Sequence, residues 1–146
     1  IGLFAPHFNA HRRFSSMFVP HNIGWGENNR SVAFRLPVSG PSARRIEHRV
    51  AGADASPHLV VSAVLAAIHY GITNQLIPTP ATVGKSKDSV PEFNAGLQLA
   101  LSRLENSELL AKYIPKRYLH AYTELKRGEY TEMMDQILPA EIDFYL

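Results

Sequence analysis

The pattern of hydrophobic and polar positions changes period near residue 50, which divides the chain into two parts. Before that point, short apolar segments separated by Gly, Pro and Asn predict strands at residues 22–26, 31–37 and 44–50. The segment VSGPSA, residues 38–43, predicts the turn of an antiparallel pair. Strands over about residues 1–50 followed by helices predict an α+β fold.

The pattern after residue 50 is helical. Pro57 favours the first turn of a helix that runs to about Asn74. Because this segment is apolar on nearly all sides, we expect it to be buried. Residues 76–90 lack periodicity and contain two prolines, which predicts a loop. After this loop we expect three helices, over residues 91–105, 107–113 and 115–136. The last residues, 137–146, are expected to form an extended tail.

Length and composition limit the class of protein. With 146 residues, 45% of them hydrophobic, the chain is long enough for one domain with a real core. The longest apolar run, residues 59–68, is too short to span a membrane, and the start lacks the layout of a signal peptide. The absence of cysteine excludes disulfides and thiolate metal sites and favours a cytoplasmic location. The chain begins at Ile1 with a sequence typical of a domain interior, so we expect a piece of a larger protein.

Charge is unevenly distributed along the chain, although the net charge is only +2. Residues 12–49 have a balance of +5, and residues 50–146 a balance of −3. All seven basic residues of the first stretch are arginines. A guanidinium group binds carboxylate or phosphate through two parallel hydrogen bonds and stays charged when it is desolvated. This stretch is therefore where we expect an anionic partner to bind.

The residue pattern alone leaves the role of these arginines open. Strand alternation places Arg45, Glu47 and Arg49 on one face. That face could be an exposed ladder of salt bridges, which stabilises little, or an anion site with Glu47 as a metal ligand or ion-pair partner. A nucleic-acid surface is a third interpretation, because phenylalanines and Trp25 lie nearby, but the net charge is small for such a surface. The seven histidines form no H-x-x-x-H pattern, so zinc has little support.

Several motifs in one order give the chain a family resemblance. They are FNAHRRF, then NNRSVAFRLP, then RRIEHR, then AGADASPHL followed by a helix. This series resembles the carboxyl-terminal part of the glutamine synthetase catalytic domain, with N-R-(S/T)-x-x-x-R-(I/L)-P and R-R-I-E-x-R at matching spacing. The resemblance runs from residue 5 to the ILPAEIDFYL ending and so implies that residues 1–146 are a C-terminal fragment of that domain.

The resemblance implies an ATP-dependent ligase that phosphorylates the side-chain carboxylate of glutamate and lets an amine attack the acyl phosphate. Arg13 matches an arginine that holds a glutamate carboxylate, and Arg49 matches a second contact to the substrate carboxylate. Arg30 matches the catalytic arginine that faces the transferred γ-phosphate. Such transfer gathers several negative charges, and positioned arginines stabilise them as charge develops.

The remaining matched residues correspond to residues that contact the nucleotide or the metal ion. Arg35 and Arg45 match nucleotide contacts, and Glu47 matches a ligand of Mg²⁺ or Mn²⁺, since both ions favour hard oxygen ligands. One glutamate cannot hold two divalent ions, so this fragment alone is expected to be inactive. Full-length relatives form stacked rings, so a homo-oligomer is expected for the complete protein, with no nucleic-acid or membrane partner.

Departures from the family pattern bear on the amine substrate. In ammonia-using enzymes a glutamate lies about six residues after the arginine that Arg13 matches, in a flap. Here the flap, residues 16–19, reads SMFV and supplies no carboxylate, and Glu27 lies much further along. The wording GWGENNR also resembles the γ-glutamylpolyamine synthetase branch. These features predict an organic amine or polyamine as acceptor, with ammonia or a non-catalytic binding derivative as alternatives. The loop at 76–90 also lacks the tyrosine that regulated bacterial members modify.

Overall fold

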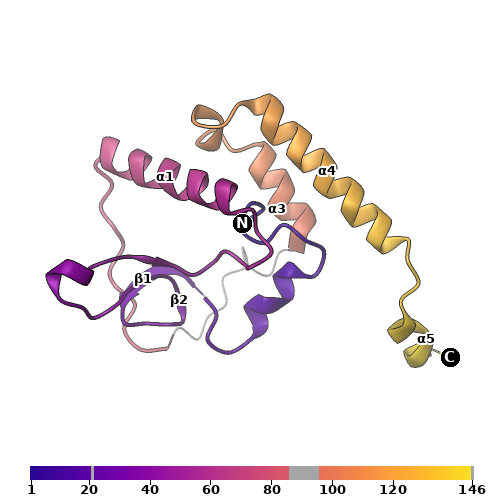
Figure 1. The fold of residues 1–146 in the computed structure, drawn as a ribbon, viewed down its shortest axis with the longest axis horizontal. Helices are drawn as coiled ribbons and strands as arrows, with labels where there is room; N and C mark the ends of the chain where they lie inside the picture. The colour runs from indigo at the N-terminus through magenta and orange to yellow at the C-terminus, as the bar shows by residue number, and fades with distance from the viewer. Residues whose placement is uncertain (21, 86–95, 146) are drawn as a thin grey trace.

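The computed structural model describes residues 1–20, 22–85 and 96–145 (Figure 1). A small sheet and a layer of helices make up an α+β fold, as the sequence pattern predicts. The strands are β1 (Asn22–Glu27), β2 (Val32–Leu36) and β3 (Glu47–His48). The helices are η1 (Ala10–Ser15), η2 (Pro41–Ala43), α1 (Pro57–Thr73), α3 (Gly96–Glu105), η3 (Leu110–Lys112), α4 (Lys116–Met134) and α5 (Pro139–Tyr145).

The sheet has the order β1-β2-β3 and mixes both pairing directions. β2 and β3 are antiparallel, with Arg35 opposite Glu47, and the connection between them contains the short helix η2. β1 and β2 are parallel, so the expectation of antiparallel strands holds only for the second pair. The reason lies in residues 28–31, where Asn28 has a left-handed backbone (φ 47°) and the Asn29 side chain accepts a hydrogen bond from the Ser31 amide. The chain therefore loops back and starts β2 beside the start of β1 instead of making a tight hairpin.

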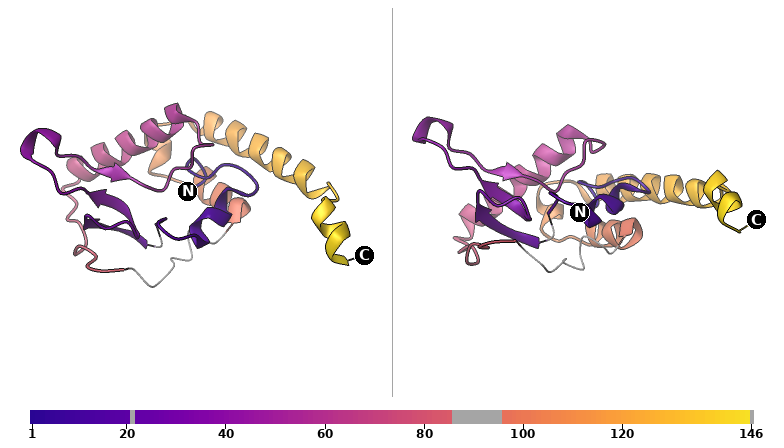
Figure 2. Two further views of the ribbon diagram at one scale, coloured as in Figure 1. Left: turned by 60° about the horizontal axis from the view of Figure 1, so that its bottom comes forward. Right: turned by 90° about the horizontal axis from the view of Figure 1, so that it is seen from below.

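Two hydrophobic clusters hold the layers together. One joins Leu3 to the helices through Ala63, Leu104, Ile114 and Leu119. The other connects η1 with β2 and consists of Ala5, Phe14, Ala33 and Val50. Phe4 packs against both clusters, so the first residues of the chain connect the sheet to the helices. Figures 1 and 2 show α1 above the sheet and α4 leading away from it toward the C-terminus.

The prediction of a buried helix at 57–74 is correct in position and wrong in burial. Only Ala63 and Ala66 of α1 are buried, whereas one apolar row is exposed. This row consists of Val61, Leu65, Ile68 and Ile72. An apolar surface on all sides predicts burial only if neighbours cover each side, and the described residues pack against α1 mainly from the side that faces Leu3 and Leu119.

The end of the chain also differs from expectation. The predicted extended tail, residues 137–146, contains the helix α5. Pro139 at its first position and Glu141 in its first turn are both favourable at a helix N-terminus, which explains the helix. The aromatic residues Phe144 and Tyr145 in this helix are exposed. Residues 91–95 of the helix expected at 91–105 lie outside the described residues, and α3 covers the rest.

No helix among the residues that the structure describes is long and apolar enough to cross a membrane.

Candidate active site

Glu47 lies between two arginines, and its carboxylate contacts both. Arg35 Nη1 donates to Glu47 Oε2 at 2.8 Å across the β2–β3 pair, and Arg45 Nη2 donates to Oε1 at 3.2 Å. The other amino group of Arg35 donates to the side chain of Asn28. The hydrogen bond from Arg35 is the main cause that lowers the pKa of Glu47, and the bond from Arg45 adds to it. Glu47 is therefore ionised throughout the physiological range.

Arg49 connects the flap to the loop before β2. Its Nη2 donates to the carbonyl oxygen of Phe18 at 2.7 Å and to that of Arg30 at 3.2 Å. Burial lowers the pKa of Arg49, and the positive charges of Arg35, Arg30 and Arg13 lower it further, while Glu47 opposes them. Salt screens electrostatic interactions beyond about 10 Å, so these side chains lie close together. We refer to Arg13, Arg30, Arg35, Arg45 and Arg49, with Glu47 among them, as the arginine cluster.

The cluster carries more positive charge than its own carboxylate balances. Arg13 donates to the carbonyl oxygen of Val50, and within the described part of the chain no acidic side chain pairs with Arg13, Arg30 or Arg49. The Nε atoms of Arg35 and Arg49 are buried and have no hydrogen-bond partner among those residues. A buried donor without a partner is costly. This arrangement favours an anion site over a simple salt-bridge ladder.

A pocket of about 810 Å³ opens beside this cluster. Its wall combines Arg30, Glu27 and the apolar flap residues Met17, Phe18 and Val19. The Phe18 side chain is 70% exposed, and its backbone has φ 64°, an unfavourable value for a bulky residue. Arg49 holds this carbonyl group, so the strained flap is fixed by the same arginine that belongs to the anion cluster.

The opposite wall of the pocket comes from the segment that the sequence identified only as a loop. Trp25 Nε1 donates to the carbonyl oxygen of Thr79 at 2.7 Å, and the amide of Thr82 donates to the carbonyl oxygen of Trp25 at 2.8 Å. Asn29 Nδ2 donates to the carbonyl oxygens of Thr82 at 3.0 Å and Gly84 at 2.8 Å. Gly26 has no room for a side chain, because a Cβ atom there would lie 2.7 Å from the Thr82 oxygen. These contacts hold the loop against β1.

The residues that the structure describes do not make a complete site for a divalent ion around Glu47. Both of its oxygens are engaged by arginines. Among the described residues, the one group of three or more side chains placed to ligate a metal lies elsewhere. Mg²⁺ and Mn²⁺ need several oxygen ligands, so Glu47 could supply one ligand and would have to exchange its arginine contacts.

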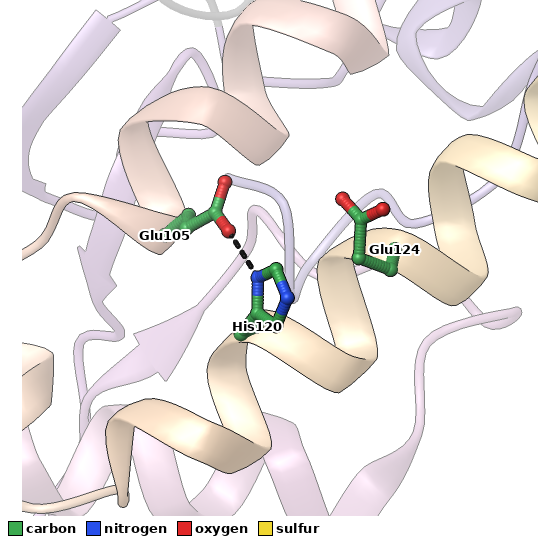
Figure 3. Close-up of side chains that lie close together, drawn as sticks. All are labelled: Glu105, His120 and Glu124. Carbon is green, nitrogen blue, oxygen red and sulfur yellow. Dashed lines mark hydrogen bonds and ion pairs between the residues drawn. The ribbon is translucent and has the colours of Figure 1, made fainter.

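That other group consists of Glu105 at the end of α3 and of His120 and Glu124 on α4 (Figure 3). His120 Nδ1 lies 2.7 Å from Glu105 Oε1. Arg127 donates to Glu105 at 2.8 Å and to Glu124 at 2.6 Å. The hydrogen bond with His120 is the main cause that lowers the pKa of Glu105. Because Arg127 engages both carboxylates, we interpret the group as an ion-pair network that ties α3 to α4.

The structure thus places all six residues singled out in the sequence within or next to η1, β2 and β3. Arg35, Arg45 and Glu47 contact one another directly. Arg49 is attracted to Glu47, lies close enough to Arg13 and Arg30 to be repelled by their charges, and donates to the carbonyl oxygen of Arg30. The roles assigned to these six residues stay predictions. Glu27 and the wall at 79–84 were missed as site elements, because their neighbours in the sequence carry no signal for the contacts that bring them together.

Comparisons with known proteins identify the family to which the chain belongs. Residues 1–145 match the sequence profile described as "Glutamine synthetase, catalytic domain". One similar protein is gamma-glutamylputrescine synthetase PuuA of Escherichia coli (strain K12), with 37% sequence identity. The alignment covers 100% of this chain and 31% of that protein. Another is glutamate–isopropylamine ligase of a Pseudomonas species, with 30% sequence identity. That alignment covers 99% of this chain and 32% of the ligase.

The fold also matches a solved structure. The chain superposes on the cryo-EM structure of Plasmodium falciparum glutamine synthetase with a TM-score of 0.80 and 18% sequence identity. The superposition covers 99% of this chain and 38% of the chain in that structure. The chain spans about a third of the length of the curated relatives it matches. On these grounds the chain belongs to the glutamine synthetase family.

Proposed function

We propose that the chain is part of an ATP-dependent ligase that joins the γ-carboxylate of glutamate to an organic amine. A γ-carboxylate oxygen attacks the terminal phosphorus of ATP, the bond to ADP breaks, and γ-glutamyl phosphate forms. The amine nitrogen then attacks the acyl carbon, phosphate leaves, and the nitrogen loses a proton. The complete protein is proposed to act as a homo-oligomer.

The arginine cluster supports the first step. Phosphoryl transfer between two anions needs fixed positive charge around the phosphorus. We assign Arg30 to the transferred phosphoryl group, Arg13 and Arg49 to the glutamate carboxylates, and Arg35 and Arg45 to the nucleotide. The two buried Nε donors without partners are the groups that a bound anion would satisfy. No step is assigned to a metal ion, because the described part of the chain does not form a complete metal site around Glu47.

The pocket beside Arg30 carries the proposal of an organic amine. An amine that attacks an acyl phosphate must reach the position next to Arg30, where Met17, Phe18 and Val19 line the space. Apolar side chains gain by contact with methylene groups, and they offer nothing to ammonium. Two relatives also have organic amines in their names, putrescine in one and isopropylamine in the other.

An amine panel tests this proposal with the full-length protein that carries this chain. ADP release would be followed with ATP, Mg²⁺ and glutamate while ammonium, butylamine, putrescine and ethanolamine are each titrated. We expect the highest kcat/KM with an organic amine. Turnover with ammonium alone would contradict the proposal, and ADP release with no amine at all would point to a different acceptor.

A further inference from the structure

Glu27 is a charged side chain of the pocket that the proposed chemistry does not yet use. It is the last residue of β1, it is exposed, and it lines the same pocket as Arg30 and the flap. Among the residues that the structure describes, no cation forms an ion pair or hydrogen bond with its carboxylate. In the sequence it stood out only by its distance from the flap position where a glutamate is expected.

The two acidic residues of the basic stretch therefore differ in what they contact. Glu47 has both oxygens bound by Arg35 and Arg45, so its charge is balanced within the sheet. Glu27 keeps its negative charge facing a cavity whose other charged wall residues are Arg30 and Lys85. Neither of these two cations forms an ion pair with it. An unbalanced carboxylate beside apolar side chains is a receptor for a cation attached to an apolar chain.

We propose that Glu27 binds the second ammonium group of a diamine substrate. This inference rests on the proposed function. A diamine uses one uncharged nitrogen as the nucleophile and keeps the other as ammonium at neutral pH. The reacting nitrogen lies near Arg30, the methylene chain contacts Met17 and Phe18, and the distal ammonium pairs with Glu27. A monoamine of equal length makes the same apolar contacts and has no group for Glu27.

The dimensions of the pocket suit such a ligand. Its volume of about 810 Å³ falls in the range of sites for small organic molecules, roughly 300–1,000 Å³, and far exceeds what ammonium needs. The hydrogen bonds of Asn29 and Trp25 fix the wall at 79–84, so the cavity exists without a ligand. Glu27 thereby becomes a residue that determines specificity and takes no part in bond making.

The test compares Glu27→Gln with the wild type in the full-length protein, using putrescine and butylamine as substrates of equal carbon number. Glutamine keeps the shape of the side chain and removes its charge. We expect the KM for putrescine to rise about fivefold, near the upper end for an exposed ion pair, and the KM for butylamine to change less than about twofold. Added salt should raise the KM of the wild type for putrescine toward its KM for butylamine. In Glu27→Gln, added salt should leave the KM for putrescine unchanged. Glu108→Gln, at an exposed glutamate without an ion pair among the described residues, is the matched control.

The outcomes separate this inference from the proposed function. If the wild type uses neither amine and turns over ammonium, the proposed function fails and Glu27 has no such ligand. If the wild type uses both amines and Glu27→Gln changes neither KM or raises both equally, the inference alone is overturned. A selective rise for putrescine supports it, and butylamine turnover in the same variant shows that the protein is folded.

Discussion

Replacing Arg49 with lysine should loosen the flap, because one planar group now holds two carbonyl oxygens. Arg49 donates to Phe18 at 2.7 Å and to Arg30 at 3.2 Å. A hydrogen bond from a charged donor contributes about 1.5–3 kcal/mol, and partial exposure places the combined loss near the lower end, about 1.5 kcal/mol. Lysine keeps the charge, but its Nζ atom lies one covalent bond closer to the backbone than Nη2 of arginine, so it does not reach both oxygens. About 1.4 kcal/mol corresponds to a tenfold change in the population of the open flap.

Chymotrypsin cleavage after Phe18 measures that population directly. This side chain is already 70% exposed, and cleavage requires that its strained backbone opens. When opening and closing are fast relative to cleavage, the rate follows the open fraction, so Arg49→Lys should be cut about tenfold faster at this bond. Mass spectrometry of the full-length protein during digestion identifies the bond.

Arg44→Lys is the matched control for this experiment. Arg44 is exposed, and the structure gives its side chain no hydrogen bond or ion pair within the described residues. Its variant should be cleaved at the wild-type rate. Equal cleavage after Phe18 in both variants would refute the reasoning that Arg49 fixes the flap, whatever happens to the enzymatic activity.

Three further predictions concern the core, the carboxylate cluster and the flap. Leu119→Ala should lower the free energy of unfolding by about 2–5 kcal/mol, because this side chain is 1% exposed, while Leu125→Ala, at 61% exposure, should change it by about 0.5 kcal/mol or less; equal urea midpoints would contradict this. The pKa of Glu47 is lowered by Arg35 from its ordinary value of 4.5, so its contribution to stability is present above pH 4.5 and is lost as the pH falls through the folded value. In Glu47→Gln, the melting temperature should therefore fall less steeply below pH 4.5 than in the wild type. An equally steep fall in both proteins would contradict the ion pair between Glu47 and Arg35. Val19→Glu places a carboxylate in the flap and should raise kcat/KM for ammonium relative to putrescine; an unchanged ratio would show that the flap does not select the amine.

Local signals predicted most of the helices. Pro57 and Pro115 stand at or just before the first residues of α1 and α4, and the apolar periodicity fixed their lengths to within a few residues. The same kind of signal is present at Pro139 and Glu141, where the helix α5 shows that the prediction of an extended tail is wrong. The prediction that α1 is buried is also wrong, because burial depends on neighbours that are distant in the sequence.

The site was predictable as a set of residue types and unpredictable as a shape. Alternation along the strand placed Arg45 and Glu47 on one face, and the contact between them confirms that placement. The parallel pairing of β1 with β2 depends on the backbone of Asn28, which no pattern of apolar residues reports. The pocket depends on contacts between Trp25 and Thr79, 54 positions apart, so Glu27 could be recognised as part of it only in the structure.

The central claim is that the site selects an organic amine over ammonium. Its most direct test offers both nucleophiles together: the full-length protein is given ATP, Mg²⁺ and glutamate with putrescine and ammonium at equal concentration, and the products are separated by mass. We predict that γ-glutamylputrescine exceeds glutamine by at least about tenfold. Glutamine as the main product would contradict the claim, since the apolar flap would then accept an ion that it cannot contact favourably.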